Sequence, residues 1–464
     1  MKLAVKTLDF PITPDRLIES LLVLSADRQV SILDSCGAPH LDSRWLIAAF
    51  DPVAAREIRA GSAAKTLRLL DRVTARRDRF AVMTFAYEFG AKILDIGNAR
   101  AVAADRTEPD VFLALYEAIV VFDYRTRCCF LAGRENRFAA IETALCTAGA
   151  FEEAAAPETI PVRSDFSRAD YLAAIERIKE HIRRGDTYQT NLTQQLRARL
   201  PETLTPQAIF HRLRRDHPAP FAAFIGRGDS TVVSASPERF FRVRSNDNRL
   251  AGAVVSTSPI KGTRPRGATA AADAKLRREL QNSVKDRAEN VMIVDLLRND
   301  LGRVCRFGSV SVEKLCELAT HTTLHHLVST VSGTLAENVT FAELLKAVFP
   351  CGSITGAPKI RTMRIIEEIE RAPRGLSMGA IGFYAPYFDL PPALENATET
   401  HQHTLLDFSV AIRTLVVRGR EAVFNIGGGI VIDSVPADEY DESLVKARAI
   451  LAAIGGKIIS QTKS

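Results

Sequence analysis

The sequence lacks the features that define several large classes of protein. It contains one Trp and five Met in 464 residues, and no stretch reaches the roughly 18 uninterrupted apolar residues of a membrane-spanning helix. Residues 1–15 hold no apolar segment of signal-peptide length, and no unit of roughly 20–50 residues repeats, which excludes solenoids and propellers. We therefore expect a soluble protein of the cytoplasm.

Composition and net charge exclude further classes. With 46% hydrophobic and 25% charged residues, the chain is an ordinary globular protein. Lys and Arg (61) exceed Asp and Glu (55) by six charges, a bias too mild for a nucleic-acid binder but compatible with a small anionic ligand. The seven cysteines show no metal-ligand spacing, and we expect reduced thiols at Cys36, Cys128, Cys129, Cys146, Cys305, Cys316 and Cys351.

A change of composition divides the chain. A Glu-, Ala- and Pro-rich stretch predicts a linker at residues 151–165, between a domain at 1–150 and a second at 166–455. Helical patterns cover 167–185, 273–303, 358–369 and 437–453; strand patterns cover 80–85, 119–122, 187–196, 231–236, 240–243, 253–257 and 323–335, with a hairpin from 408–417 and 422–432. Runs of strands between long helices predict an α+β fold, with large antiparallel sheets packed as a sandwich and helices outside.

The last predicted helix carries a charged face. Glu439, Glu442 and Lys446 stand at i, i+3 and i+7 and therefore share one side of the helix. Two carboxylates and an ammonium so placed can hold a hard cation and an anion. The same pattern is typical of a solvated, salt-bridged surface, so both interpretations stay open.

Glycines mark two candidate anion sites. Gly427, Gly428 and Gly429 at a strand end either turn their N–H groups toward an anion or form a tight bulge. Arg413, expected on the partner strand of the hairpin, can add a bidentate carboxylate contact. The segment Gly352–Lys359 opens a helix, which favours anion binding, but it lacks the spacing of a nucleotide-binding P-loop.

Four further residues have a chemical and a structural interpretation. Lys261 lies before a Gly turn and is either a desolvated nucleophile or base, or a solvated charge. Glu238 is either a general acid/base or a partner for its neighbour Arg239. Glu289 enters an apolar helix and needs a metal or a partner such as Lys285 or Arg287. His326 alternates with His325 on a strand, so one of the two can face inward as a proton donor.

The order of these segments resembles that of the chorismate-utilising enzymes. The resemblance rests on Gly185-Asp-Thr-Tyr-Gln-Thr-Asn-Leu192, Ser236-Pro-Glu238, Pro259-Ile-Lys-Gly-Thr263, Asp295-Leu-Leu-Arg-Asn-Asp300, Gly352–Lys359 and Gly427–Gly429. It covers residues 167–451 and implies the family's fold for the catalytic domain, whereas residues 1–150 more weakly resemble the N-terminal domain of anthranilate synthase component I.

Two positions separate branches of that family. Lys261 is similar to the Lys of aminodeoxychorismate synthases, where anthranilate synthase component I usually carries Ala. Gln189 stands where isochorismate and salicylate synthases carry a water-activating Lys, and an amide cannot act as that base. The resemblance implies amination of chorismate at ring carbon 4 for p-aminobenzoate and folate synthesis. The alternative is the anthranilate synthase reaction, which yields anthranilate and pyruvate.

The resemblance also implies roles for the candidate residues. Mg²⁺ would be bound by Glu289 and Glu442, with Glu439 close by. Lys261 would attack ring carbon 2 and Glu238 would act as acid/base. Substrate contacts would come from Arg413, Gly427, Gly428, Gly429 and Gln189, with His326, Ser353 and Lys446 as supporting polar groups. No Cys lies in a Gly-rich nucleophile elbow with a downstream His, so ammonia would come from a separate glutaminase subunit.

Two segments depart from the family pattern. Residues 385–405 form a longer loop, for which we expect an inert insertion rather than a lid or a partner contact. The chain between Glu238 and Lys261 also looks extended around residues 245–248.

Overall fold

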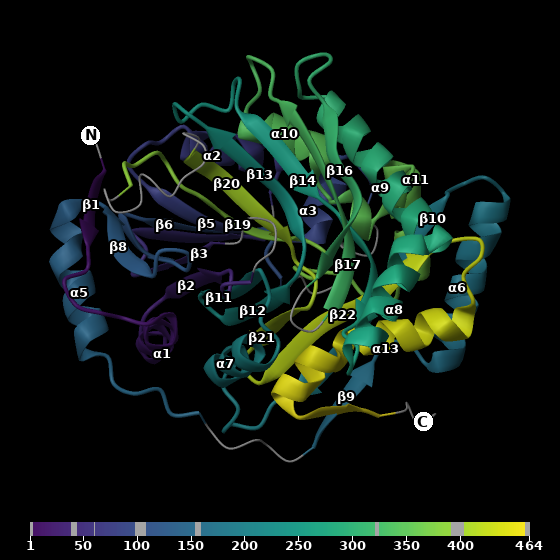
Figure 1. Ribbon diagram of the computed structural model, residues 1–464, viewed down its shortest axis with the longest axis horizontal. Coiled ribbons are helices and arrows are strands. Elements are labelled where there is room, and N and C mark those ends of the chain that lie inside the picture. The colour runs from purple at the N-terminus through teal and green to yellow at the C-terminus, as the bar shows by residue number, and fades with distance from the viewer. Residues whose placement is uncertain are drawn as a thin grey trace.

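The computed structural model of the protein describes residues 3–38, 44–59, 61–97, 108–153, 159–320, 324–390 and 403–459 (Figure 1). It is an α+β fold built on two large, almost entirely antiparallel sheets. In the described residues, no helix has the length and apolar character needed to span a membrane. The predicted fold class is confirmed.

The first sheet has 13 strands and draws on both ends of the chain. Its order is β1 (Ala4–Thr7), β8 (Cys128–Gly133), β7 (Ala118–Asp123), β3 (Trp45–Phe50), β2 (Val30–Asp34), β11 (Phe221–Gly226), β12 (Ser230–Ser236), β21 (Thr414–Arg418), β22 (Glu421–Ile430), β10 (Gln189–Arg199), β9 (Ile160–Ser164) and β23 (Gly456–Ile458), with β18 (Gly356–Ala357) also paired to β10.

The second sheet has ten strands. Its order is β15 (Ile260–Pro265), β17 (Leu324–Thr334), β14 (Val254–Ser258), β13 (Arg239–Ser245), β20 (His403–Val410), β19 (Ala380–Tyr384), β5 (Phe80–Phe85), β6 (Val111–Tyr116) and β4 (Ala54–Ile58), with β16 (Ser311–Thr320) paired to β17.

Helices cover the outer faces of both sheets. They are α1 (Pro14–Leu24), α2 (Ala63–Thr74), α3 (Tyr87–Ile93), α5 (Phe138–Thr147), α6 (Arg168–Arg183), α7 (Pro206–Asp216), α8 (Ala270–Asn282), α9 (Val284–Gly302), α10 (Phe341–Val348), α11 (Lys359–Ile369) and α13 (Pro436–Ile454). The first sheet packs against α1, α7 and α13, and the second against α2, α9 and α10. A third apolar core joins the two sheets, so the predicted sandwich with outer helices is confirmed.

Strand β7 shows how the sequence builds these layers. Its even-numbered residues Ala118, Val120 and Phe122 belong to the helix-side core, whereas Ile119 and Val121 belong to the core between the sheets. Side chains alternate between the faces of a strand, and both faces here are buried. The sequence of the strand is therefore one continuous apolar run. Periodicity alone does not show which residues face the helices and which face the other sheet.

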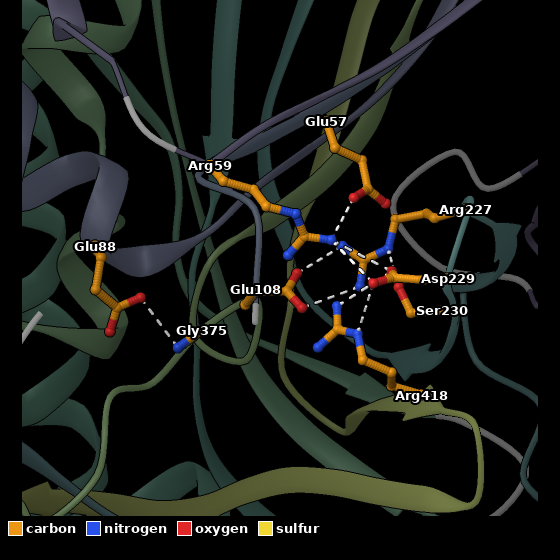
Figure 2. Close-up of polar contacts among 9 residues, drawn as sticks. All are labelled: Glu57, Arg59, Glu88, Glu108, Arg227, Asp229, Ser230, Gly375 and Arg418. Carbon is orange, nitrogen blue, oxygen red and sulfur yellow. Dashed lines mark hydrogen bonds and ion pairs between the residues drawn. The ribbon is translucent and has the colours of Figure 1, made fainter. Parts of the chain in front are cut away.

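Both sheets combine strands from the two sides of the predicted linker. β2 pairs with β11 in the first sheet, and β5 pairs with β19 in the second. A cluster of charged side chains adds to this connection: the fully buried Arg227 guanidinium donates to both oxygens of Glu108 at 2.6 and 3.0 Å, while Arg59 and Arg418 bind Asp229 (Figure 2). The domain boundaries themselves stay a prediction, and residues 154–158 of the linker lie outside the described residues.

Two predicted elements are wrong in outline. The helix expected over 273–303 is two helices, because Ser283 adopts an extended conformation and its hydroxyl caps α9 by accepting from the Asp286 N–H. The strand expected over 408–417 is divided at residues 411–413, where Arg413 has φ 50°, so that β20 and β21 belong to different sheets. Most of the predicted insertion, residues 391–402, lies outside the described residues.

Candidate functional site

The floor of the candidate site is the pairing of β10 with β22. Gly427, Gly428 and Gly429 lie within β22 in regular register opposite Thr193, Leu192 and Asn191, so the interpretation as a bulge is wrong. A Cβ on Gly427 would lie 1.9 Å from the Leu192 carbonyl oxygen, and one on Gly429 would lie 2.4 Å from Gln189 Nε2. A side chain at position 427 would therefore collide with the backbone of β10, and one at position 429 would displace the Gln189 side chain.

Two amide side chains project from β10. Gln189 is fully buried, and neither its Oε1 nor its Nε2 has a hydrogen-bond partner in the described part of the chain. Asn191, two residues along and hence on the same face, leaves its buried Nδ2 unpaired in the same way. Buried amides normally find partners, so these groups are available to a ligand.

Lys261 of β15 reaches the same place from the second sheet. Its Nζ would be 3.4 Å from a Cβ on Gly429, beside the Gln189 amide. Burial raises the pKa of Glu238 and Glu289, and the charge of Lys261 opposes that shift; the same charge adds to the lowering of the pKa of Glu442 by Lys446. The Lys261 ammonium therefore acts on three carboxyl groups that the sequence analysis selected separately.

The charged face of α13 is directed to this site. Glu439 is 5% exposed, and its carboxylate accepts from the Ser434 hydroxyl at 2.7 Å. Lys446 donates to the Gly427 carbonyl at 2.9 Å and pairs with the exposed Glu442, also at 2.9 Å. Lys446 therefore lowers the pKa of Glu442 below its ordinary value. A purely solvated surface face is wrong for Glu439, since that side chain is buried against the glycines.

A cation already lies among the three predicted metal ligands. Lys285 of α9 donates to Glu439 at 3.2 Å, and although burial acts to lower the pKa of Lys285, Glu439, Glu289 and Glu442 together raise it. Lys285 stands four residues before Glu289 on α9, as the structural interpretation of Glu289 expected, and its contact with Glu439 extends this network to α13. Burial raises the pKa of Glu289, with Lys261 and Lys285 opposing that shift.

The donor set fits a magnesium ion completed by other ligands. Among the described residues, no group of three or more His, Cys, Asp or Glu side chains is arranged to hold a metal ion alone. Mg²⁺ usually takes one or two carboxylates and fills its remaining positions with water and substrate oxygens. The ammonium of Lys285 shows that Glu289, Glu439 and Glu442 stabilise positive charge between them.

Glu238 lies in the turn between β12 and β13 and is 4% exposed. Burial raises its pKa to about 7, while the Ser353 hydroxyl and Lys261 act to lower it. Its Oε1 is buried without a hydrogen-bond partner in the residues described. Such a carboxyl holds or releases a proton near neutral pH, as a general acid or base must.

Both histidines of β17 are buried, one on each face of the strand. Helix α8 covers the second face, where His325 contacts Asp273 at 2.9 Å and Thr320 at 3.0 Å. His326 lies opposite Thr263 of β15, and its Nδ1 is 3.0 Å from the Thr263 hydroxyl. His326 is thereby held next to Thr263, which stands two positions after Lys261 on β15.

Arg413 lies in the bend before β21 and not on a strand. Its carbonyl accepts from the Ala235 N–H at 3.1 Å, which places it beside the segment leading to Glu238. Its guanidinium makes no hydrogen bond or ion pair with another described residue, and burial lowers its pKa. An unpaired, desolvated guanidinium is suited to an anionic ligand.

The segment Gly352–Lys359 does not provide a free cation. Lys359 Nζ donates to Asp300 at 2.6 Å and to the Val348 carbonyl at 3.0 Å, and both side chains of the pair are buried. The expected anion site at this helix start is therefore not supplied by Lys359. Ser353, by contrast, lies in the 3₁₀ turn Gly352–Ile354 and reaches Glu238.

Replacement of Lys359 by Met is expected to lower the free energy of unfolding by about 3–5 kcal/mol, because it leaves the Asp300 carboxylate buried without its partner. Urea denaturation measures this difference. Lys346→Met, which alters an exposed lysine of α10, is the matched control and should change stability by less than about 0.5 kcal/mol. Equal stability of the two variants would contradict the structural role of Lys359.

Three functional candidates escaped the sequence analysis. Lys285 appeared only as a possible helix partner, Ser434 had no recognisable pattern, and Asn191 was overlooked although its spacing from Gln189 placed both on one strand face. Asn191 could have been found from the sequence, because residues two apart on a strand share one face and Gln189 had already been selected. The Lys285 contact depends on how α9 and α13 approach each other, and the Ser434 contact depends on the turn that leads into α13.

Comparison with known proteins adds independent findings. The chain matches the family described as chorismate binding enzyme over residues 39–452. An aminodeoxychorismate synthase from Streptomyces griseus is 41% identical over 364 residues, which cover 75% of this chain and 47% of that protein. Aminodeoxychorismate synthase component 1 from Bacillus subtilis is 35% identical over 373 residues, covering 77% of this chain and 74% of that protein. This chain thus spans about half the length of the Streptomyces griseus relative.

Solved structures share the architecture. Anthranilate synthase component I from Streptococcus pneumoniae superposes with a TM-score of 0.72 at 27% identity, covering 88% of this chain and 92% of that one. The menaquinone-specific isochorismate synthase from Escherichia coli gives a TM-score of 0.70 at 16% identity, covering 97% and 94%. The second likeness concerns the fold alone.

Proposed function

This chain belongs to the chorismate binding enzyme family, and we propose that it converts chorismate to 4-amino-4-deoxychorismate with ammonia as the nitrogen donor. This reaction supplies p-aminobenzoate and folate synthesis. Support comes from relatives named aminodeoxychorismate synthase in Streptomyces griseus and Bacillus subtilis.

One observation carries the proposal. Lys261 stands over the cleared face of Gly429, next to the unpaired Gln189 amide, and its charge acts on Glu238, Glu289 and Glu442. A lysine at the centre of such a site is positioned to react with the substrate and not merely to face solvent. An anthranilate synthase needs no nucleophilic side chain at the position of Lys261.

The chemistry of the first step follows from Lys261 and Glu238. The neutral Lys261 amine forms a bond to ring carbon 2, the ring double bonds shift, and the bond from carbon 4 to its hydroxyl breaks. Glu238 gives its proton to that hydroxyl, which leaves as water. Ammonia then forms a bond to carbon 4, the double bonds shift back and the bond to Lys261 breaks.

The remaining residues bind and orient the substrate. Arg413, Lys446 and the backbone of Gly427–Gly429 offer positive charge and N–H donors to its carboxylates, and Ser353 and His326 hold Glu238 and the Lys261 strand. Glu289, Glu442 and Glu439 would hold Mg²⁺, which when bound neutralises and anchors a substrate carboxylate.

Ammonia is the expected nucleophile because Gln189 is an amide and cannot activate water. We propose that a separate glutaminase subunit in the cytoplasm delivers it. The relative from Bacillus subtilis, named component 1, supports a two-component arrangement.

Product analysis tests this function. The purified chain incubated with chorismate, Mg²⁺ and an ammonium salt is expected to yield 4-amino-4-deoxychorismate, identified by mass spectrometry. Anthranilate with pyruvate would assign the anthranilate synthase reaction instead. Isochorismate or salicylate would overturn amination altogether.

The pH dependence of the reaction is expected to change near pH 7. Glu238 donates its proton only while protonated, and its pKa is about 7, so its contribution to kcat/KM should fall about tenfold per pH unit on the alkaline side, opposed by the increase in neutral Lys261 amine and in free ammonia. Because the Ser353 hydroxyl lowers that pKa, Ser353→Ala should move the falling limb to higher pH. A pH–rate profile that is unchanged in Ser353→Ala would contradict the assignment of Glu238.

A further inference from the structure

A second cavity, with a few polar groups among apolar walls, lies between α3 and α11 behind one wall of the candidate site. It has a volume of about 40 Å³, and Tyr87, Glu88, Glu367, Glu370 and Arg374 supply its polar lining. Ala91, Ile96, Met363 and Ile366 form its apolar walls. A volume of this size holds one particle the size of water, whose share of the liquid is about 30 Å³.

Arg374 separates this cavity from the site. Its guanidinium donates to the carbonyls of Ile354 and Asn191, each at 2.7 Å, and to both oxygens of Glu370 at 2.7 and 2.9 Å. Ile354 follows Ser353, and Asn191 carries the unpaired amide that faces the glycines. The cavity and the site therefore share one wall.

The lining carries more negative than positive charge. Arg374 matches the charge of Glu370, whereas Glu88 and Glu367 form no ion pair within the described residues. Glu88 instead accepts the backbone N–H groups of Arg374 at 2.7 Å and Gly375 at 3.0 Å, the second of which Figure 2 shows. Burial raises the pKa of Glu88 to about 7.

Two acceptors in the lining are unused. Tyr87 is 6% exposed, and neither its hydroxyl nor the buried Oε1 of Glu367 has a hydrogen-bond partner in the part of the chain that the structure describes. Burial raises the pKa of Tyr87, the charge of Arg374 acts to lower it, and the charges of Glu370, Glu88 and Glu367 act to raise it. A buried oxygen left unpaired is costly, and a small donor would satisfy both groups.

We propose that this cavity binds the ammonium ion from which the site draws its nitrogen, and that the ion gives one proton to a lining carboxylate before it reacts as ammonia. Ammonium is about the size of water, carries one positive charge and donates four hydrogen bonds, which suits the unpaired oxygens of Tyr87 and Glu367 and the carboxylates beside them. Only the use of the ion as a nitrogen source rests on the proposed function. Binding of the ion to the cavity can be tested separately.

Thallium diffraction tests binding without turnover, because Tl⁺ substitutes for ammonium and scatters anomalously. Crystals of the full chain grown in sodium salts and soaked in thallium acetate should show an anomalous peak among Tyr87, Glu88, Glu367 and Glu370. Ammonium should displace it and Glu367→Gln should remove it. No peak would overturn the proposal, and equal displacement by potassium would overturn the assignment to ammonium.

Kinetics test whether the bound ion feeds the reaction. Glu367→Gln and Tyr87→Phe each remove an acceptor, and each should raise the KM for ammonium about tenfold, with the KM for chorismate unchanged. Glu368→Gln, one residue further along α11 and outside the cavity lining, is the control and should leave both constants unchanged. An unaltered KM for ammonium in both test variants would overturn the role of the cavity in nitrogen supply.

Discussion

Lys261→Ala is expected to slow formation of 4-amino-4-deoxychorismate by about a thousandfold or more, because it removes the proposed nucleophile. The residual chemistry should shift toward amination at carbon 2, since anthranilate synthases carry Ala at this position. Chromatography of the products with mass detection measures both changes. Lys275→Ala, which alters a 75% exposed lysine of α8, is the control and should have normal activity.

The covalent step has its own measurement. Wild-type protein incubated with chorismate and Mg²⁺ without ammonia should gain the mass of the substrate minus water, and Lys261→Ala should not. A Lys261→Ala enzyme that still makes only the carbon-4 product at a normal rate would show that ammonia attacks directly. Lys261 would then be a binding residue whose charge orients the carboxyl groups around it.

Glu442→Ala is expected to weaken Mg²⁺ binding by about a hundredfold and to abolish activity at limiting Mg²⁺, because it removes a proposed ligand. Isothermal titration calorimetry measures the first effect and initial rates the second. The side chain is 56% exposed, so the free energy of unfolding should change by less than about 0.5 kcal/mol.

Asp441→Ala is the matched control for this experiment. Asp441 precedes Glu442 on α13 and is exposed, but it does not belong to the face that meets the glycines. If both variants bind Mg²⁺ like the wild type, the Glu442–Lys446 pair is a surface salt bridge of the kind that contributes little.

The architecture could be predicted from the sequence where local patterns decide it. The apolar run 119–122 became part of β7, and the helical pattern over 167–185 became α6. The break at Ser283 was missed because the helical pattern continues across it, so only the hydrogen bond from the Asp286 N–H to the Ser283 hydroxyl marks the boundary. The division of 408–417 was missed because a strand that changes sheets keeps one apolar pattern through the bend.

The candidate site was predictable residue by residue but not as an arrangement. Lys261, Glu238 and Gly427–Gly429 were selected from separate segments, and no sequence rule shows that they meet. Their meeting depends on β15 of one sheet reaching over β22 of the other. Lys285 was considered as a partner of Glu289, but its contact with Glu439 was missed for the same reason, since the two residues are 154 positions apart on different helices.

The pairing of β5 with β19 constrains the order in which the chain can fold during synthesis. Ala380 is made about 300 residues after Phe85, which takes a ribosome about 15–60 s at roughly 5–20 residues per second. Throughout this interval β5 is an apolar edge without its neighbour, and such edges pair readily with other chains. The nascent N-terminal half should therefore depend on chaperones, and yields should fall when translation outpaces them.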